Sequence, residues 1–161
     1  MFEMAQFVGR AVRTVRERDA EALEKDGGVF DCSLLLGGQI GDRRLRLFMI
    51  YRAGNFLETT QETPYAQIGE HKYGKPILDR VAQPTMRLGQ AAKLILLSFD
   101  STLRSNLSVG MPIDILVYER DSLDLRREKR IGQDDDYFRK LSSSWSEALR
   151  EAFTKIDEFD V

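Results

Sequence analysis

Cysteine, histidine and long apolar runs are scarce or absent in this sequence, and each shortage excludes a class of protein. Cys32 is the one cysteine, so no disulfide forms within the chain, which fits a reducing cytoplasm. His71 is the one histidine, which excludes a histidine-rich zinc site and leaves His71 alone to serve a Ser-His-Asp triad. No apolar run approaches the ~18 residues that span a bilayer, and the first residues do not resemble a signal peptide.

The charge balance is close to neutral. The chain has 24 basic and 26 acidic residues and a formal net charge of -2. Because no overall cationic field results, we expect neither nucleic acid nor a membrane as a partner. The 161 residues, 42% of them hydrophobic, suit one globular domain with a core of useful size.

Hydrophobic periodicity predicts alternating groups of helices and strands. Helices are expected over 2–25 and 76–81, in a third segment that Thr85 would cap at its start, and from 134 onward. Strands are expected over 29–36, 44–51, 56–59 and 112–118. The charged segment 121–133 reads as an exposed loop. The last helix carries an apolar stripe that includes Trp145 and Phe153, which we interpret as core or subunit interface.

This order of elements predicts an α+β fold in which helices cover antiparallel sheet. About four strands are visible, whereas the mean sheet has ~5–6. Several strands are apolar on both faces, which indicates that both faces are covered. The chain therefore looks like part of a domain.

Four long stretches make the sequence recognisable. They are LLLGGQ at 34–39, RLFMIYRAGNF at 46–56, QIGEHKYGKPILD at 67–79 and DSTLRSNLSVGMPID at 100–114. Together they resemble the bacterial proteasome-type proteases, and most closely the ancestral beta-subunit family called Anbu. The resemblance covers roughly residues 1–120, and the tail from Asp121 is less distinctive.

The resemblance implies a four-layer αββα sandwich of the N-terminal-nucleophile hydrolases. In that family an N-terminal threonine or serine hydroxyl attacks the peptide carbonyl, and its own α-amino group, of pKa ~8, acts as the base. An aspartate and a lysine from the leading strands tune the site. The family also implies polypeptide substrates, self-association into a large homo-oligomer, a cytoplasmic location and no cofactor or metal.

The leading strands have no counterpart in this sequence. We therefore expect residues 1–161 to be one incomplete proteasome-like domain, with 121–161 as a charged loop and C-terminal helix. The nucleophile, its aspartate and its lysine are expected to be missing, so this polypeptide alone should have no peptidase activity.

Two helper positions of the family can be matched here. Glu70 stands where a Gly-Ser-Gly turn places a serine near the nucleophile's amine, and its charge would raise the pKa of that amine. Asn106, four residues before Gly110, stands where the family has an aspartate, and Ser105 or Asp100 replaces it if the alignment slips. The alternative, purely structural interpretations are that Glu70 is a loop glutamate in solvent or paired with Lys72, and that Asn106 is a turn residue.

Other interpretations stay open. A non-catalytic structural subunit of a proteasome-like assembly would keep the fold without the nucleophile. A small-molecule module could use the loop from Gly69 to Gly74, although this loop lacks the spacing of a phosphate loop. His71 is expected to face solvent or be satisfied within that loop, and Cys32 is expected to be buried in a strand and inert.

Overall fold

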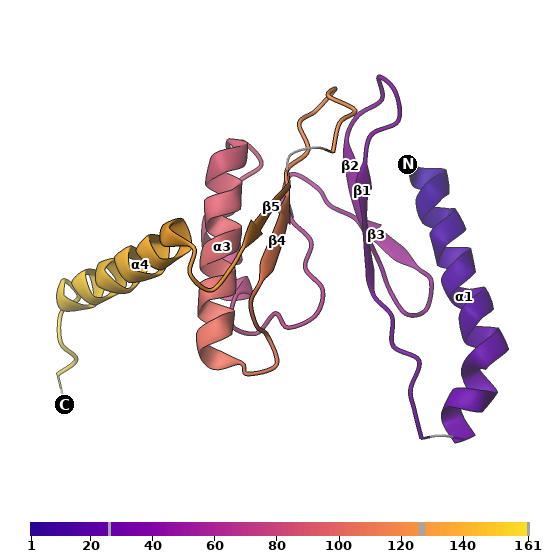
Figure 1. The fold of residues 1–161 in the computed structure, drawn as a ribbon, viewed down its shortest axis with the longest axis horizontal. Coiled ribbons are helices and arrows are strands. Elements are labelled where there is room, and N and C mark those ends of the chain that lie inside the picture. The colour runs from indigo at the N-terminus through magenta and orange to yellow at the C-terminus, as the bar shows by residue number, and fades with distance from the viewer. Residues whose placement is uncertain (26, 126–127, 161) are drawn as a thin grey trace. The chain divides into compact units, whose positions relative to one another are not determined.

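The structure, a computed structural model, describes residues 1–25, 27–125 and 128–160, and these form two compact units (Figure 1). Unit 1 comprises Met1–His71, Gln83–Thr85 and Tyr118–Asp124. Unit 2 comprises Lys72–Ala82, Met86–Val117 and Leu125–Val161. Together the units contain helices and antiparallel sheets, which confirms the predicted α+β class.

Unit 1 is one long helix beside a three-stranded antiparallel sheet (Figure 1). The helix is α1, Phe2–Lys25, as the periodicity predicts. The strands lie in the order β1, β2, β3 and cover Leu34–Gly38, Arg46–Ile50 and Phe56–Glu58. The short turns between consecutive strands explain the antiparallel pairing.

The core of unit 1 lies between α1 and β2. Phe48 and Ile50 alternate along β2 and are fully buried, as is Ala5 of α1. The ring of Phe56 packs edge-on against Phe48 and against Phe2 at the start of α1, with ring centroids 5.7 and 5.3 Å apart. One face of the sheet is thus covered by the helix.

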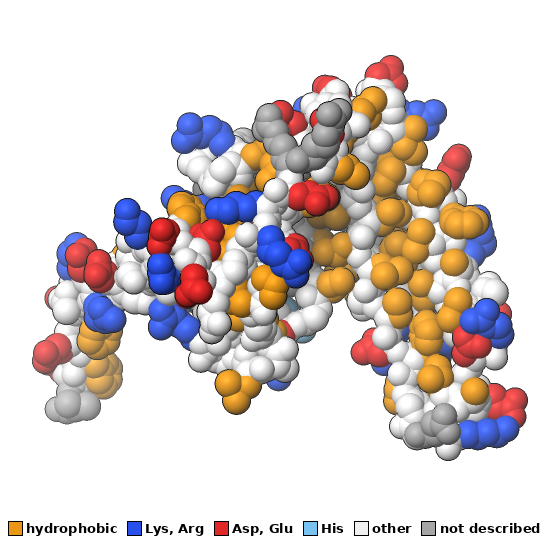
Figure 2. All heavy atoms as spheres, in the orientation of Figure 1, with side chains coloured by type: hydrophobic (Ala, Val, Ile, Leu, Met, Phe, Trp, Pro, Cys, Tyr) orange, Lys and Arg blue, Asp and Glu red, His pale blue; other side chains and the backbone are white. Residues whose placement is uncertain are grey.

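The other face of this sheet carries exposed leucines. Leu35 lies opposite Met49, which lies opposite Leu57, so the three residues share a face. Leu35 and Leu57 are 42% and 61% exposed. Figure 2 shows hydrophobic side chains gathered over the sheet and α1. Since leucine gains free energy by leaving water, this unit exposes a face suited to further covering.

Unit 2 comprises three helices and a two-stranded antiparallel sheet. The helices are α2, α3 and α4, over Lys75–Val81, Leu88–Ser105 and Asp136–Thr154; the strands are β4, Ile113–Leu116, and β5, Glu128–Ile131. A buried cluster joins the two strands to α3 and α4 through Leu96, Ile113, Ile131 and Phe138. Asp135 caps α4 by accepting a hydrogen bond from the Phe138 amide, 2.9 Å away, which also lowers the pKa of that carboxyl.

Three sequence predictions are wrong in detail. The strand expected over 29–36 begins at Leu34, so the half-buried Cys32 precedes β1 and does not lie in a strand. Thr85 is not the cap of α3, because the helix begins at Leu88 and the Gln90 side chain accepts from the Arg87 amide, 3.1 Å away. The expected loop 121–133 contains β5, whose Ile131 is buried because it faces the unit's core.

An ion pair connects β2 to β3 beside the core of unit 1. Arg46 donates two hydrogen bonds to Glu58, one of them 2.6 Å long from Nε, and its guanidinium lies 4.8 Å from the Phe48 ring centroid. The hydrogen bonds from Arg46 lower the pKa of the Glu58 carboxyl and raise the pKa of Arg46.

We expect Glu58→Gln to lower the melting temperature by about 1–3 °C at pH 7. The effect is small because the ion pair with Arg46 is partly exposed, but it is measurable because Glu58 holds the Arg46 guanidinium over the Phe48 ring. A carboxyl whose pKa is lower when folded stabilises above its unfolded pKa of ~4.3, and this stabilisation is lost as the pH falls through the folded pKa. The melting temperatures of wild type and variant should therefore approach each other as the pH falls below ~4.3 and become equal only below the folded pKa of Glu58. Glu17→Gln on exposed α1 is the matched control, and a gap that persists at low pH would contradict the assignment.

Candidate active-site residues

The loop that carries Glu70 connects β3 to α2 and is held by local hydrogen bonds. Gly69 has a φ of +77°, a conformation that glycine adopts without steric cost. The Gln67 side-chain amide donates to the Glu70 carbonyl at 3.2 Å, and Nδ1 of His71 lies 3.1 Å from the Gly69 carbonyl. Glu70 is half-buried, whereas His71 is exposed, as expected for a loop histidine.

Gln67 is a residue of this loop that the sequence analysis did not single out. Its Oε1 atom is buried and accepts no hydrogen bond from the part of the chain that the structure describes. A buried acceptor without a donor is costly, so a donor from outside these residues is expected to reach it. The only advance signal was its place in the recognisable stretch 67–79, three residues before Glu70.

Asn106 ends α3 and organises the turn that follows. Its amide donates to the Thr102 carbonyl at 2.9 Å. Its side-chain Oδ1 accepts from the Ser108 amide at 2.8 Å and from the Ser108 hydroxyl at 2.6 Å. This is the geometry of a turn asparagine, in which the side-chain oxygen is already engaged. Ser105, the last residue of α3, is exposed.

Asp100, the other alternative, lies on the buried side of α3. Its side chain is 6% exposed and pairs with Arg104, whose Nε is 3.2 Å from the carboxylate. Arg104 also donates to the Ser142 hydroxyl on α4 at 2.7 Å. Asp100 therefore helps to join α3 to α4, a structural contact that accounts for its burial.

The helper candidates fall into both units. Glu70 and Gln67 belong to unit 1, whereas Asp100, Ser105 and Asn106 belong to unit 2. Within unit 2, Ser105 and Asn106 are chain neighbours at one end of α3, and Asp100 lies more than one turn earlier. Their roles toward a nucleophile stay predictions.

Within residues 1–25, 27–125 and 128–160, no three His, Cys, Asp or Glu side chains gather as metal ligands. In the same ranges, the helices are too short or too polar for any of them to cross a bilayer.

Solved structures of other proteins match this chain along its whole length. A scan of protein-family models and a search of curated proteins found no match. An Anbu (Gly-1) mutant from Hyphomicrobium sp. strain MC1 is 62% identical, with a TM-score of 0.91, over 100% of this chain and 66% of its own. Anbu (ancestral beta-subunit) from Yersinia bercovieri is 47% identical, with a TM-score of 0.90, and the match covers 100% of this chain and 68% of the Yersinia chain.

A third structure is the helical assembly of the Anbu complex from Pseudomonas aeruginosa. It is 43% identical, with a TM-score of 0.91, over 99% of this chain and 66% of its own. The chain thus spans about two thirds of the length of the solved structures it matches.

Proposed function

The chain belongs to the ancestral beta-subunit (Anbu) family, and from this we propose that it is the larger part of a proteasome-type peptidase subunit. The observation that carries the proposal is the match to Anbu structures over the entire chain at 43–62% identity. In the complete protein, a threonine or serine at the N-terminus would attack the peptide carbonyl of a polypeptide substrate, with its own amine as base.

The exposed face of the β1–β2–β3 sheet supports a four-layer sandwich in the complete protein. About a third of the first matched chain has no counterpart in this sequence. Strands from that third would cover the face that carries Leu35 and Leu57. Residues 1–161 then form one incomplete proteasome-like domain, ending in the charged segment and helix of 121–161.

Self-association is the second part of the proposal. The P. aeruginosa relative forms a helical assembly, and enclosure keeps an indiscriminate peptidase away from folded proteins. A large homo-oligomer of the complete protein in the cytoplasm, without cofactor or nucleic acid, agrees with the near-neutral charge and the single cysteine.

A specific observation favours the alternative of a non-catalytic structural subunit. Glu70 and Asn106 stand at positions where the family has a serine and an aspartate that assist the nucleophile. In addition, the Asn106 Oδ1 atom already accepts hydrogen bonds from the amide and hydroxyl of Ser108. A glutamate near the nucleophile's amine would keep it protonated, and a protonated amine is no base. Such a subunit would assemble without hydrolysing peptides.

The test uses the complete protein purified with its natural N-terminus. Intact mass after reaction with a threonine-directed peptide electrophile should show one adduct per chain, and mapping should place it on an N-terminal threonine or serine. Light scattering on the same sample should show a large particle. An N-terminal alanine variant is the control and should assemble without forming the adduct.

The two candidate functions separate in this experiment. A large particle that forms no adduct would favour the structural subunit over the peptidase. A protein that stays monomeric and unreactive would contradict both.

A further inference from the structure

The end of the chain exposes an apolar and acidic segment. The C-terminal half of α4 extends away from α3, and the chain continues to residue 160 (Figure 1). Phe153, Ile156 and Phe159 are 78%, 72% and 87% exposed. Lys155 and three acidic residues, Asp157, Glu158 and Asp160, lie between and beside these apolar residues. None of the three acids forms an ion pair within the described residues. We call residues 153–160 the tail.

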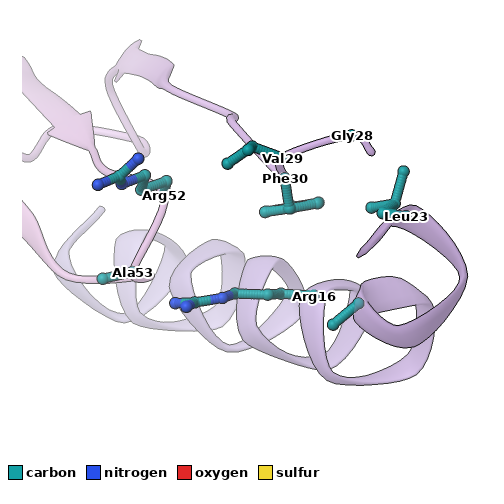
Figure 3. Close-up of a pocket in the computed structure, with 8 residues that line it drawn as sticks. Arg16, Leu23, Gly28, Val29, Phe30, Arg52 and Ala53 are labelled. Carbon is teal, nitrogen blue, oxygen red and sulfur yellow. The ribbon is translucent and has the colours of Figure 1, made fainter. Parts of the chain in front are cut away.

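Unit 1 holds a pocket of complementary character (Figure 3). It lies between α1 and the segment that precedes β1, and its volume is about 450 Å³, in the range of ligand sites. One part of the pocket wall is apolar and consists of Leu23, Val29 and Phe30. Two cationic side chains, Arg16 and Arg52, also line the pocket.

The two arginines indicate which kind of ligand the pocket suits. Arg16 and Arg52 form no ion pair or hydrogen bond with any side chain that the structure describes. By contrast, Arg13 on the same helix donates to the Gly54 carbonyl at 2.8 Å, and Arg18 pairs with Asp19. An unpaired arginine beside an apolar wall suits a ligand with both a carboxylate and a hydrophobic group.

We propose that the tail of one copy of this chain docks in the pocket of a second copy. Phe159 and Ile156 would pack against Leu23 and Phe30, and the acids around Phe159 would pair with Arg16 and Arg52. The inference rests on the proposed self-association and names the contact that produces it. Because tail and pocket are different surfaces, the contact is heterologous, and repeated heterologous contacts build rings or open helices.

The test exchanges charges in the complete protein and measures assembly by sedimentation velocity. A pocket variant carries Arg16→Glu and Arg52→Glu, and a tail variant carries Asp157→Lys and Glu158→Lys. Each alone should weaken association at least ~10-fold, because like charges then face each other. A matched control, Arg10→Glu with Arg43→Glu, makes the same charge change on exposed arginines outside the pocket and should assemble as wild type.

Mixing the two variants decides between docking onto a second copy and docking within one chain. The acidic tail of the pocket variant meets the unchanged pocket of the tail variant, and the reversed tail meets the reversed pocket. Assembly should therefore return in the mixture. If both variants assemble as wild type, or if the mixture associates no better than its components, the inference is overturned.

A second measurement covers the case in which the pocket variant fails to fold, as judged by circular dichroism. A synthetic peptide of residues 149–160 should dissociate wild-type assemblies, while the same peptide with the two lysine changes should not. Failure of the unchanged peptide to compete would overturn the inference. A monomeric wild type would overturn both this inference and the proposed self-association, whereas assembly that ignores tail and pocket overturns this inference alone.

Discussion

Replacing Gly9 by valine is expected to lower the stability of the complete protein by about 3 kcal/mol, with a fall in melting temperature of roughly 6–12 °C. Gly9 is buried in α1 where the helix meets the turn between β2 and β3. A Cβ atom at this position would lie 2.2 Å from the carbonyl oxygen of Gly54. No contact that short is tolerated, so helix or turn must move.

Movement of either partner is costly because the turn is itself constrained. Gly54 has a φ of +73°, and its amide donates to the Tyr51 carbonyl at 2.7 Å. Arg13 donates to the Gly54 carbonyl from the next turn of α1. Shifting α1 would also separate it from Phe48, so the side chain added at position 9 opens the core of unit 1.

Gly89→Val is the matched control for this prediction. Gly89 lies in the first turn of α3, and a Cβ there meets no atom within 4 Å. Since valine is no worse than glycine in a helix, this variant should stay within about 0.5 kcal/mol of wild type. Thermal melting followed by circular dichroism measures both, and equal melting temperatures for the two variants would contradict the close approach of Gly9 and Gly54.

The elements predicted well from sequence are those whose own residues carry the signal. Apolar residues within 2–25 repeat at helical spacing, and the acids at 134–136 mark the start of α4, so both helices were expected. β5 was not, because Glu128, Lys129 and Arg130 resemble a solvated loop. Its existence depends on pairing with β4, which places Ile131 opposite Ile113 in the core.

The candidate site shows the same division. Glu70 and Asn106 could be found because they stand inside long recognisable stretches. Gln67 stands in the same stretch as Glu70 but could not be singled out, since nothing in its type or spacing predicts that Oε1 is buried without a donor among the described residues. The Gly9–Gly54 contact was also invisible, because it joins residues 45 positions apart through backbone atoms alone. Burial and close approach are properties of the packed units and leave no local pattern.

The last prediction concerns Glu70 and the amine of the nucleophile. Under the proposed function, a carboxylate at position 70 raises the pKa of that amine and so reduces the fraction that can act as base at neutral pH. Glu70→Gln in the complete protein keeps the shape and removes the charge. We expect the pKa that limits kcat/KM on the acid side to fall by about one unit, which raises kcat/KM up to ~10-fold below the wild-type pKa.

The pH profile separates this effect from a structural one. Above both pKa values the amine is neutral in either protein, so the two rates should converge at high pH. Glu62→Gln, an equal charge change on an exposed residue near the start of the same loop, should leave the profile unchanged. A uniform change in rate at every pH would mean that Glu70 acts through the loop's structure. No change at all would mean that it lies too far from the amine, and the family's serine position would then have no functional counterpart in this chain.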